Sequence, residues 1–200
     1  LNKLITYTFT NISIPPMIPF ILYGSVKVGE LVLGNPVDIA SIAGGKAPVD
    51  ERSLAEADTT NQWFVADNKH NAKLQQTLKL ADLKASDYKA VLFAGGHGTM
   101  WDFPQDKALQ QFAADLYQNN GIVAAVCHGP AALLNIKLAD GSYLIAGKQV
   151  TGFSNTEEEQ VKLTKVVPFS LQDQLTQRGA SYSAAANWQS KVVVDQRVVT

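Results

Sequence analysis

Two short apolar runs, separated by one amphipathic stretch, constrain the fold of this chain most strongly. The runs span residues 90–93 and 122–126, and glycines lie close to both of them. Short apolar runs bounded in this way are typical of buried strands. Between them, apolar residues recur at spacings of three and four, which predicts a helix that ends near residues 119–121. The residues on this stripe are Leu109, Phe112, Ala113, Leu116 and Tyr117.

The succession of strand, helix and strand predicts an α/β fold. Parallel strands need crossover connections, and such crossovers cover the faces of the sheet with helices. A third apolar run at residues 37–41 predicts another strand, and residues 4–9 are a candidate first strand. Pro130 suits the first turn of a short helix over residues 131–134, because its missing N–H would have no partner there.

The C-terminal third of the chain predicts two β-hairpins with two helices between them. The hairpins span residues 143–151 and 191–200, where apolar residues flank turn-forming residues. The helices span residues 157–165 and 170–177, and Ser170 is a candidate N-cap of the second one. We therefore expect a parallel sheet covered by helices, with additional β-hairpins.

The composition is that of a globular domain. Apolar residues make up 46% of the chain and charged residues 18%, which excludes the disordered and coiled-coil classes. Two hundred residues fit one domain of ordinary size. We expect residues 1–200 to form this single domain. The chain does not begin with Met and ends on an apolar run, so we expect it to be a fragment.

Charge and hydropathy argue against two classes of partner. The 17 basic and 18 acidic side chains give a net charge of −1, so the positive field that collects nucleic acid is missing. The longest apolar stretch, residues 17–23, contains a proline and is much shorter than the roughly 18–20 residues of a membrane helix. A single cysteine cannot form an internal disulfide, which favours a reducing compartment.

The only cysteine, Cys127, lies between a predicted buried strand and a predicted helix. A nucleophile elbow has this position, and the unpaired N–H groups of a helix N-terminus favour a thiolate over a thiol. The small residue Gly129 is expected to leave room for a substrate beside the sulfur. The alternative is a buried thiol that packs as a small apolar side chain, which is the usual fate of a lone cysteine.

A glycine-rich turn, Gly95-Gly96-His97-Gly98, follows the strand predicted at residues 90–93. Strand ends of one parallel sheet share an edge, so this turn should face the same crevice as Cys127. The N–H groups of Gly96 and His97 are candidate donors to an oxyanion. The turn lacks the dinucleotide and phosphate-loop patterns, and simple chain reversal is its alternative role.

A metal site is the other chemistry that these side chains suggest. His97, His128 and Cys127 are all good zinc ligands. The same residue types serve acid–base catalysis beside a thiol equally well, and we therefore expect no metal.

Three motifs together resemble the PfpI superfamily, of the class I glutamine amidotransferase-like fold, and within it the glyoxalase III or heat-shock-protein-31-like branch. They are AGGHGTMWDFP at residues 94–104, AVCHGP at residues 125–130 and VTGF at residues 150–153. Residues 44–50 and 195–200 add support. In relatives the second of these segments continues into a turn and a last helix, so the resemblance implies a domain truncated at the C-terminus. The resemblance covers roughly residues 37–200 and implies a flavodoxin-like parallel sheet sandwiched by helices.

The resemblance also implies a catalytic triad. Cys127 matches the family nucleophile, and His128 matches its acid–base partner. An acidic residue a few positions beyond the third motif completes the triad in the branch. Glu158 is the match, with Glu157 and Glu159 left open as alternatives, and a solvated acidic helix start is the other interpretation of all three.

Two further site residues rest on the same resemblance or on position. The family has a second glutamate close to the cysteine sulfur, and Glu30, in the segment at residues 23–31, is its nearest match here. An exposed loop carboxylate is the alternative for Glu30. Trp101, four residues beyond His97, is expected to line the site or to fill the core.

The function implied by the resemblance is that of a glyoxalase III-like lyase of the D-lactate dehydratase type. Such an enzyme converts methylglyoxal and similar α-oxoaldehydes to hydroxy acids through a cysteine nucleophile, without glutathione. We expect a small aldehyde substrate, no cofactor and a cytoplasmic homodimer. Two alternatives remain: a stress-response chaperone (holdase) with a redox-sensitive cysteine, and a cysteine peptidase or amidohydrolase.

Overall fold

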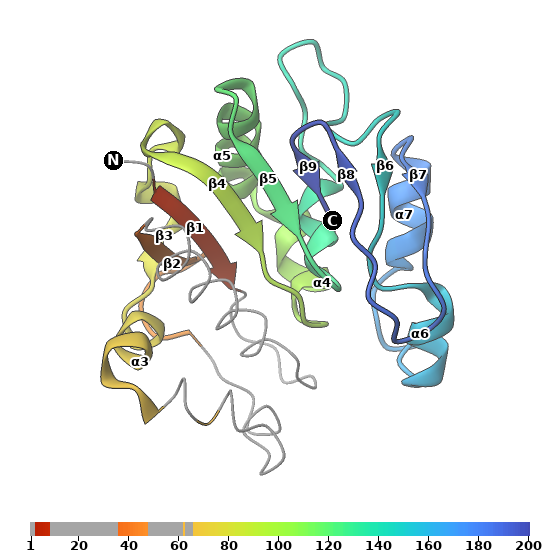
Figure 1. The fold of residues 1–200 in the computed structure, drawn as a ribbon, viewed down its shortest axis with the longest axis horizontal. Coiled ribbons are helices and arrows are strands. Elements are labelled where there is room, and N and C mark those ends of the chain that lie inside the picture. The colour runs from red at the N-terminus through yellow and green to blue at the C-terminus, as the bar shows by residue number, and fades with distance from the viewer. Residues whose placement is uncertain (1–2, 9–35, 48–61, 63–65) are drawn as a thin grey trace.

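The structure is a computed structural model that describes residues 3–8, 36–47, 62 and 66–200. In this part of the chain seven strands form one sheet in the order β3-β2-β1-β4-β5-β9-β8 (Figure 1). The strands are β1 (Lys3–Thr8), β2 (Val37–Ser41), β3 (Leu78–Lys79), β4 (Tyr88–Phe93), β5 (Ile122–Ala125), β8 (Val194–Asp195) and β9 (Val198–Val199). All neighbouring pairs are parallel except β8 and β9. The α/β fold with a parallel sheet is thus confirmed.

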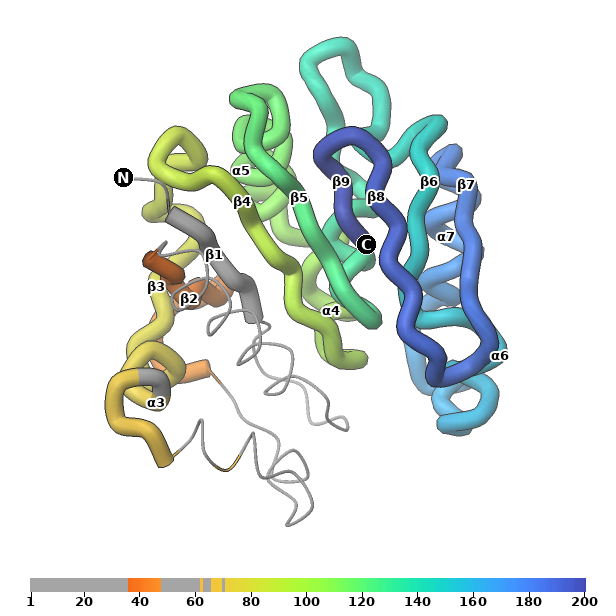
Figure 2. Tube along the Cα trace, in the orientation of Figure 1, coloured from red at the N-terminus to blue at the C-terminus, as the bar shows by residue number. Residues whose placement is uncertain are grey.

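The order of the strands places β4 and β5 in the middle of the sheet. The register pairs Phe93 of β4 with Ala125 of β5, so these strands end side by side. Figure 2 shows the chain returning from its C-terminal part to lay β9 beside β5. The predicted strands at residues 37–41, 90–93 and 122–126 correspond to β2, β4 and β5, and the candidate first strand to β1.

The longest described helix, α5 (Lys107–Gln118), lies against one face of the sheet (Figure 1). Its N-cap is Asp106, whose carboxylate accepts a hydrogen bond from the Leu109 N–H at 2.7 Å. This is the helix predicted between the two apolar runs. The other described helices are α3 (Asn68–Gln75), α4 (Thr99–Asp102), α6 (Asn155–Gln160) and α7 (Leu171–Gln177), with 3-10 segments η3 (Leu80–Asp82), η4 (Ala85–Asp87), η5 (Phe103–Gln105) and η6 (Gly129–Leu133).

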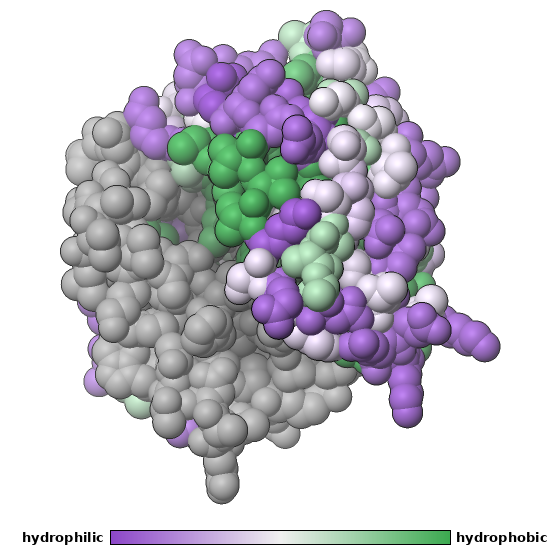
Figure 3. Space-filling model, turned by 45° about the vertical axis from the view of Figure 1, so that its right-hand side comes forward, coloured by the Kyte–Doolittle hydropathy of each residue, from purple (hydrophilic) through white to green (hydrophobic). Residues whose placement is uncertain are grey.

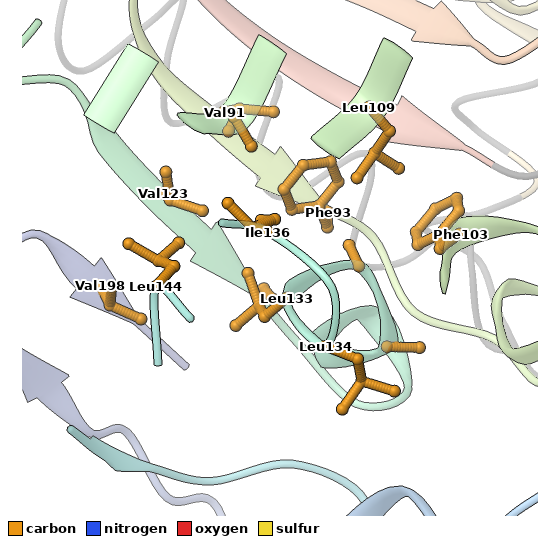
Figure 4. Close-up of a cluster of buried hydrophobic side chains, with 14 of the residues drawn as sticks. Val91, Phe93, Phe103, Leu109, Val123, Leu133, Leu134, Ile136, Leu144 and Val198 are labelled. Atoms are coloured by element: carbon orange, nitrogen blue, oxygen red, sulfur yellow. The ribbon is translucent and has the colours of Figure 1, made fainter. Parts of the chain in front are cut away.

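The main hydrophobic core lies between the sheet and α5 with η6 (Figure 4). Side chains of alternate strand residues point to this side, because neighbouring residues in a strand face opposite ways. They meet the loop that follows η6, and together they form one apolar cluster. Its fully buried members include Val91, Phe93, Leu109, Val123, Leu133, Ile136, Ile145 and Val198.

Strands β5 and β8 also carry exposed apolar side chains. Ile122, which precedes the buried Val123, is 43% exposed, and Val194 of β8 is 65% exposed. Figure 3 shows an apolar area on the face of the molecule that it presents. Within the described ranges, we find no helix long and apolar enough to span a bilayer.

One of the two predicted hairpins is confirmed and the other is wrong. Residues 191–200 contain the antiparallel pair β8 and β9. Residues 143–151 form no hairpin: Gly147, with φ +74°, lies in a turn, and β6 (Gln149–Val150) pairs in parallel with the distant β7 (Ser181–Tyr182). The turn at Gly147 therefore reverses the chain, but the residues before and after it do not pair with each other as strands.

The three helices predicted after Cys127 are present, but two of them differ from the prediction in type or in bounds. The segment after Cys127 is the five-residue 3-10 segment η6 and not an α-helix. The helix expected over residues 157–165 is α6, which begins and ends earlier. The helix expected at residues 170–177 is α7, and Ser170 caps it as predicted.

Candidate active site

The glycine-rich turn and the cysteine turn meet where β4 and β5 end. A Cβ atom on Gly95 would lie 2.6 Å from the Cβ of Cys127, so this approach requires a glycine. The buried Thr99 hydroxyl lies 2.8 Å from the Gly96 carbonyl oxygen and 3.1 Å from that of His128. Thr99 thus bridges the two turns and fixes their spacing.

The backbone of Cys127 is strained in the way expected of a nucleophile elbow. Its φ of +60° lies in the left-handed region, which non-glycine residues rarely adopt. The conformation is held on both sides: Val126 N–H donates to the Phe93 carbonyl at 3.2 Å, and Phe153 N–H donates to the Cys127 carbonyl at 2.8 Å. Strain that the surrounding structure maintains is common at active sites.

Cys127, His128 and Glu158 form one connected line of side chains. The Cys127 Sγ lies 3.5 Å from the Nδ1 of His128, and the Nε2 of His128 lies 2.7 Å from Oε2 of Glu158. His128 is buried, and Glu158 is only 7% exposed. The order of groups is nucleophile, base and orienting carboxylate, which is the general pattern of an activated nucleophile.

The charge of Glu158 fixes which nitrogen of His128 is free. Burial by itself raises the pKa of this carboxyl, but hydrogen bonds from His128 and His97 outweigh burial and lower the pKa to about 2. An ionised carboxylate can only accept hydrogen bonds, so Nε2 of His128 must carry a proton. In the neutral ring, Nδ1 is then unprotonated and faces the thiol as an acceptor.

The environment favours a thiol at Cys127 rather than a thiolate. Burial raises its pKa to about 11, although the backbone N–H groups of His128 and Gly96 act in the opposite direction. This differs from the expected lowering by a helix N-terminus. The physical reason is that η6 is a short 3-10 segment, whose few N–H groups do not offset the loss of solvation.

Helix α6 selects one of the three candidate glutamates. Ser154 caps α6, and its hydroxyl and N–H form a capping box with Glu157. Glu157 also accepts a hydrogen bond from the Trp188 N–H at 3.0 Å, and Glu159 is exposed. Glu158 is the one that reaches His128, because it projects from α6 into the protein.

His97 contributes its ring to the same cluster. Its Nε2 lies 2.8 Å from Oε1 of Glu158, and its ring centroid is 4.1 Å from that of His128. The predicted donors to an oxyanion were backbone N–H groups. Gly96 has an N–H that donates to the Cys127 sulfur, whereas His97 reaches the cluster through its side chain.

His97, His128 and Glu158 are also the described residues that come closest to a metal site. Their potential ligand atoms lie within 4.8 Å of one another. The nitrogen–oxygen distances of 2.7 and 2.8 Å are those of hydrogen bonds. Two ligands held about 2.0–2.2 Å from one tetrahedral zinc ion would lie further apart than this. The arrangement is therefore that of an acid–base cluster.

Two other predicted site residues have surroundings other than those expected, and a third lies outside the described residues. Gly129 is buried, and a Cβ atom there would lie 2.2 Å from the Phe93 carbonyl oxygen, so its missing side chain makes room for β4 and not for a substrate. Trp101 packs against the hydrophobic core and is not among the described residues that line the cavity beside Cys127. Glu30 lies outside the described residues.

A cavity of about 530 Å³ opens beside Cys127. It runs between the end of β5, the Thr151-Gly152-Phe153 segment and residues 184–192. The ring of Phe153 lies 4.2 Å from that of His128 and 6.0 Å from that of Trp188, centroid to centroid. Sequence reasoning missed Phe153 as a lining residue, although it stood in a recognised motif, and it placed Trp101 near the site in preference to Trp188.

Known proteins with similar sequences support this description. The sequence profile of the DJ-1/PfpI family matches residues 57–200. A glutathione-independent glyoxalase of Saccharomyces cerevisiae, HSP31, is 34% identical over 84% of this chain and 74% of its own length. Glyoxalase 3 of Candida albicans is 35% identical over 65% of this chain, which spans 58% of that protein.

Solved structures give the same result. The Rapid Encystment Protein of 24 kDa from Francisella tularensis has a TM-score of 0.91 and 38% identity, over 100% of this chain and 91% of its own. Glyoxalase III from Candida albicans has a TM-score of 0.86 and 25% identity, over 99% of this chain and 89% of its own. Both similarities include the strand ends that carry the cluster.

Proposed function

The chain belongs to the DJ-1/PfpI family, and from this premise we propose that it is a glutathione-independent glyoxalase. Its substrates are methylglyoxal and similar α-oxoaldehydes, which it converts to 2-hydroxy acids. The observation that carries the proposal is the line from Cys127 Sγ through His128 to Glu158, with an unprotonated Nδ1 facing the thiol. Relatives that bear the name of this activity are about one third identical to the chain.

The reaction begins with attack by the sulfur on the aldehyde carbon. The thiol proton passes to Nδ1 of His128, 3.5 Å away, and the new carbon–sulfur bond gives a hemithioacetal. Glu158 stabilises the imidazolium that forms, because its ionised carboxylate accepts the hydrogen bond from Nε2. The N–H of Gly96 points at the sulfur and is placed to donate to the developing oxygen anion.

The second stage moves a proton between two neighbouring carbons. His128 gives its proton to the oxygen on the former aldehyde carbon, which completes the hemithioacetal. It then removes the proton from that carbon and returns it to the former keto carbon, while the hydroxyl proton passes from the oxygen of the first carbon to that of the second. The electron pair of the broken C–H bond becomes part of the enediol and then of the new C–H bond, so no external oxidant or reductant is needed. The resulting thioester is hydrolysed by water, which releases the 2-hydroxy acid and restores the thiol.

Lactate formation from methylglyoxal without glutathione tests this proposal. The Cys127→Ala variant should form none, and His128→Ala should be slower by about 10²–10⁴-fold, the usual contribution of a general base. Glu159→Gln is the matched control, because Glu159 is an exposed neighbour of Glu158 on α6. Full activity in Cys127→Ala would contradict the cysteine route.

The same variants separate the proposal from its two alternatives. A holdase should suppress aggregation of a client protein equally well with His128→Ala, since such binding needs no proton transfer. A peptidase or amidohydrolase should release amine from peptide or amide substrates and lose that activity with Cys127→Ala.

We also propose that the protein is a cytoplasmic homodimer. Light scattering after gel filtration measures the number of chains in the assembly.

A further inference from the structure

Glu158 is held by two histidines rather than one. Each oxygen of its carboxylate has its own partner: Oε2 lies 2.7 Å from Nε2 of His128, and Oε1 lies 2.8 Å from Nε2 of His97. Resting on the proposed function, we propose that His97 is a positioning residue, whose imidazole fixes the Glu158 carboxylate so that His128 presents Nδ1 to the Cys127 sulfur.

The need for a second anchor follows from the Glu158 side chain. A glutamate has three rotatable side-chain bonds, and its carboxylate rotates freely if only one oxygen is held. A partner on each oxygen fixes both the position and the plane of the group. The orientation of His128 depends on that plane, because its Nε2–H must lie near the lone-pair direction of the accepting oxygen.

Ring contacts make His97 part of the same rigid unit. The centroids of the His97 and His128 rings are 4.1 Å apart, and the ring of Phe153 contacts His128 at 4.2 Å. The side chain of His97 is 11% exposed, against 1% for that of His128. His97 thus packs against His128 and lies closer to solvent than His128 does.

The turn that carries His97 also carries the N–H that faces the sulfur. Gly96 donates toward Cys127 Sγ, and Thr99 joins the Gly96 carbonyl to that of His128. One turn therefore places a donor at the nucleophile and an anchor at the far end of the triad. A displacement of His97 would therefore affect both the Cys127 sulfur and the Glu158 carboxylate.

His97 also affects the acid–base balance of His128. The titratable groups that face His128 are Cys127, His97, Glu157 and Glu158. Burial is the main cause that lowers the pKa of His128, and the charge of His97 lowers it further. Loss of the His97 imidazole should therefore raise the pKa of His128 and move the acidic limb of the rate profile to higher pH.

The test compares His97→Ala with His97→Gln. The amide nitrogen of glutamine can occupy the place of Nε2 and donate to Glu158, whereas alanine cannot. We expect His97→Ala to lower kcat on the order of 10- to 100-fold with little change in KM, the size typical of a small misplacement of catalytic groups. His97→Gln should recover most of kcat, whereas the acidic limb should move to higher pH in both variants, because both lack the charge of the His97 imidazole.

A second readout does not depend on the glyoxalase reaction. The rate at which iodoacetamide alkylates Cys127 at neutral pH should fall in His97→Ala and recover in His97→Gln. If the wild-type protein formed no lactate but alkylation was slower in His97→Ala, the positioning role of His97 would be supported and the proposed function would be overturned. The positioning role would be overturned if a folded His97→Ala kept the wild-type kcat, acidic limb and alkylation rate. It would also be overturned if both variants lost the same amount of kcat at equal Tm.

Discussion

At the scale of single residues, the resting state of Cys127 is set by two opposing effects. Loss of solvation raises the thiol pKa to about 11, and backbone N–H groups only partly counter it. Near neutral pH the sulfur therefore carries its proton, and its reactivity depends on a neighbour that can take this proton. Nδ1 of His128 is that neighbour, because Nε2 is committed to Glu158.

We predict that His128→Ala slows alkylation of Cys127 at neutral pH by about 10²-fold, because the thiol loses its base. The rate constant for iodoacetamide, followed from neutral to strongly alkaline pH, measures this effect. The rates of the variant and the wild type should converge once hydroxide alone ionises the thiol. A wild-type midpoint below the ordinary thiol value of about 8.5 would instead mean that the thiolate exists at rest.

Gly129 provides a second prediction at this scale. A Cβ atom there would lie 2.2 Å from the Phe93 carbonyl oxygen, far inside van der Waals contact. Gly129→Ala should lower stability by about 3 kcal/mol and reduce activity, because the Cys127 turn must move away from β4. Thermal unfolding and lactate formation measure the two effects.

Gly141→Ala is the matched control for Gly129→Ala. Gly141 has a φ of +80° and open space where a Cβ atom would be. Its substitution should cost about 1–2 kcal/mol from backbone strain alone and leave activity intact. Equal activity losses in the two variants would contradict the role assigned to the contact of Gly129 with β4.

Residue identity predicted the candidate site unevenly. Cys127 was marked by its place between a predicted strand and a predicted helix, whereas His128 and Glu158 were assigned by the family resemblance, which left Glu157 and Glu159 open. The ring of His97 was missed as a partner of Glu158, because only the folded chain brings residues 61 positions apart to hydrogen-bond distance. A glycine likewise does not reveal from sequence whether the space beside it is empty or filled by backbone.

At the scale of elements, α6 is short and its cap matters for the site. Its six residues carry Glu158, and the Ser154 hydroxyl accepts the Glu157 N–H within a capping box. A helix of this length has little stability of its own. The position of the carboxylate therefore depends on how firmly the first turn is held.

We predict that Ser154→Ala lowers stability by about 1 kcal/mol and also lowers kcat, since the first turn of α6 loosens around Glu158. Asp106→Ala is the control: it removes the N-cap of α5 at a similar cost, but α5 carries no residue of the candidate site. Urea unfolding gives the stabilities, and lactate formation gives kcat. Equal effects of the two variants on kcat would show that the cap of α6 has no special part in the site.

Local pattern predicted the central elements better than the peripheral ones. Helix α5 buries one apolar stripe, and strand β5 is a short apolar run that buries alternate residues, so the sequence pattern marks both clearly. Residues 143–151 failed as a hairpin because Leu144 and Ile145 enter the core from a loop, while β6 finds its partner about thirty residues later in β7. A pairing with a distant strand leaves no trace in local alternation.

At the scale of the whole molecule, the sheet brings the site together. Parallel strands β4 and β5 end at one edge and deliver His97 and Cys127, and the chain must then cross to α6 before Glu158 can join them (Figure 1). The order of the strands cannot be read from the sequence, since β9 returns to pair with β5 from far along the chain. Because the cluster is assembled from three separate segments, global unfolding separates its titratable groups and removes the interactions that shift their pKa values.

Acid should therefore destabilise the native state through this cluster. Hydrogen bonds from His128 and His97 outweigh burial and hold the pKa of Glu158 at about 2, against 4.5 in an unfolded chain. A carboxyl with a lowered native pKa adds stability that is fully present above pH 4.5 and is lost as the pH falls toward about 2. Burial also lowers the pKa of His128, so its protonation adds a loss in the same direction below its ordinary value of 6.5.

The last prediction concerns the pH dependence of unfolding. The stability of the wild type should exceed that of Glu158→Gln near neutral pH, and the difference should shrink as the pH falls from 4.5 toward 2. Urea unfolding at a series of pH values measures it, with Glu159→Gln as the control from the exposed side of α6. That control should follow the wild type across the series. A difference between wild type and Glu158→Gln that stays constant down to pH 2 would mean that Glu158 is not held as an ion by its two histidines.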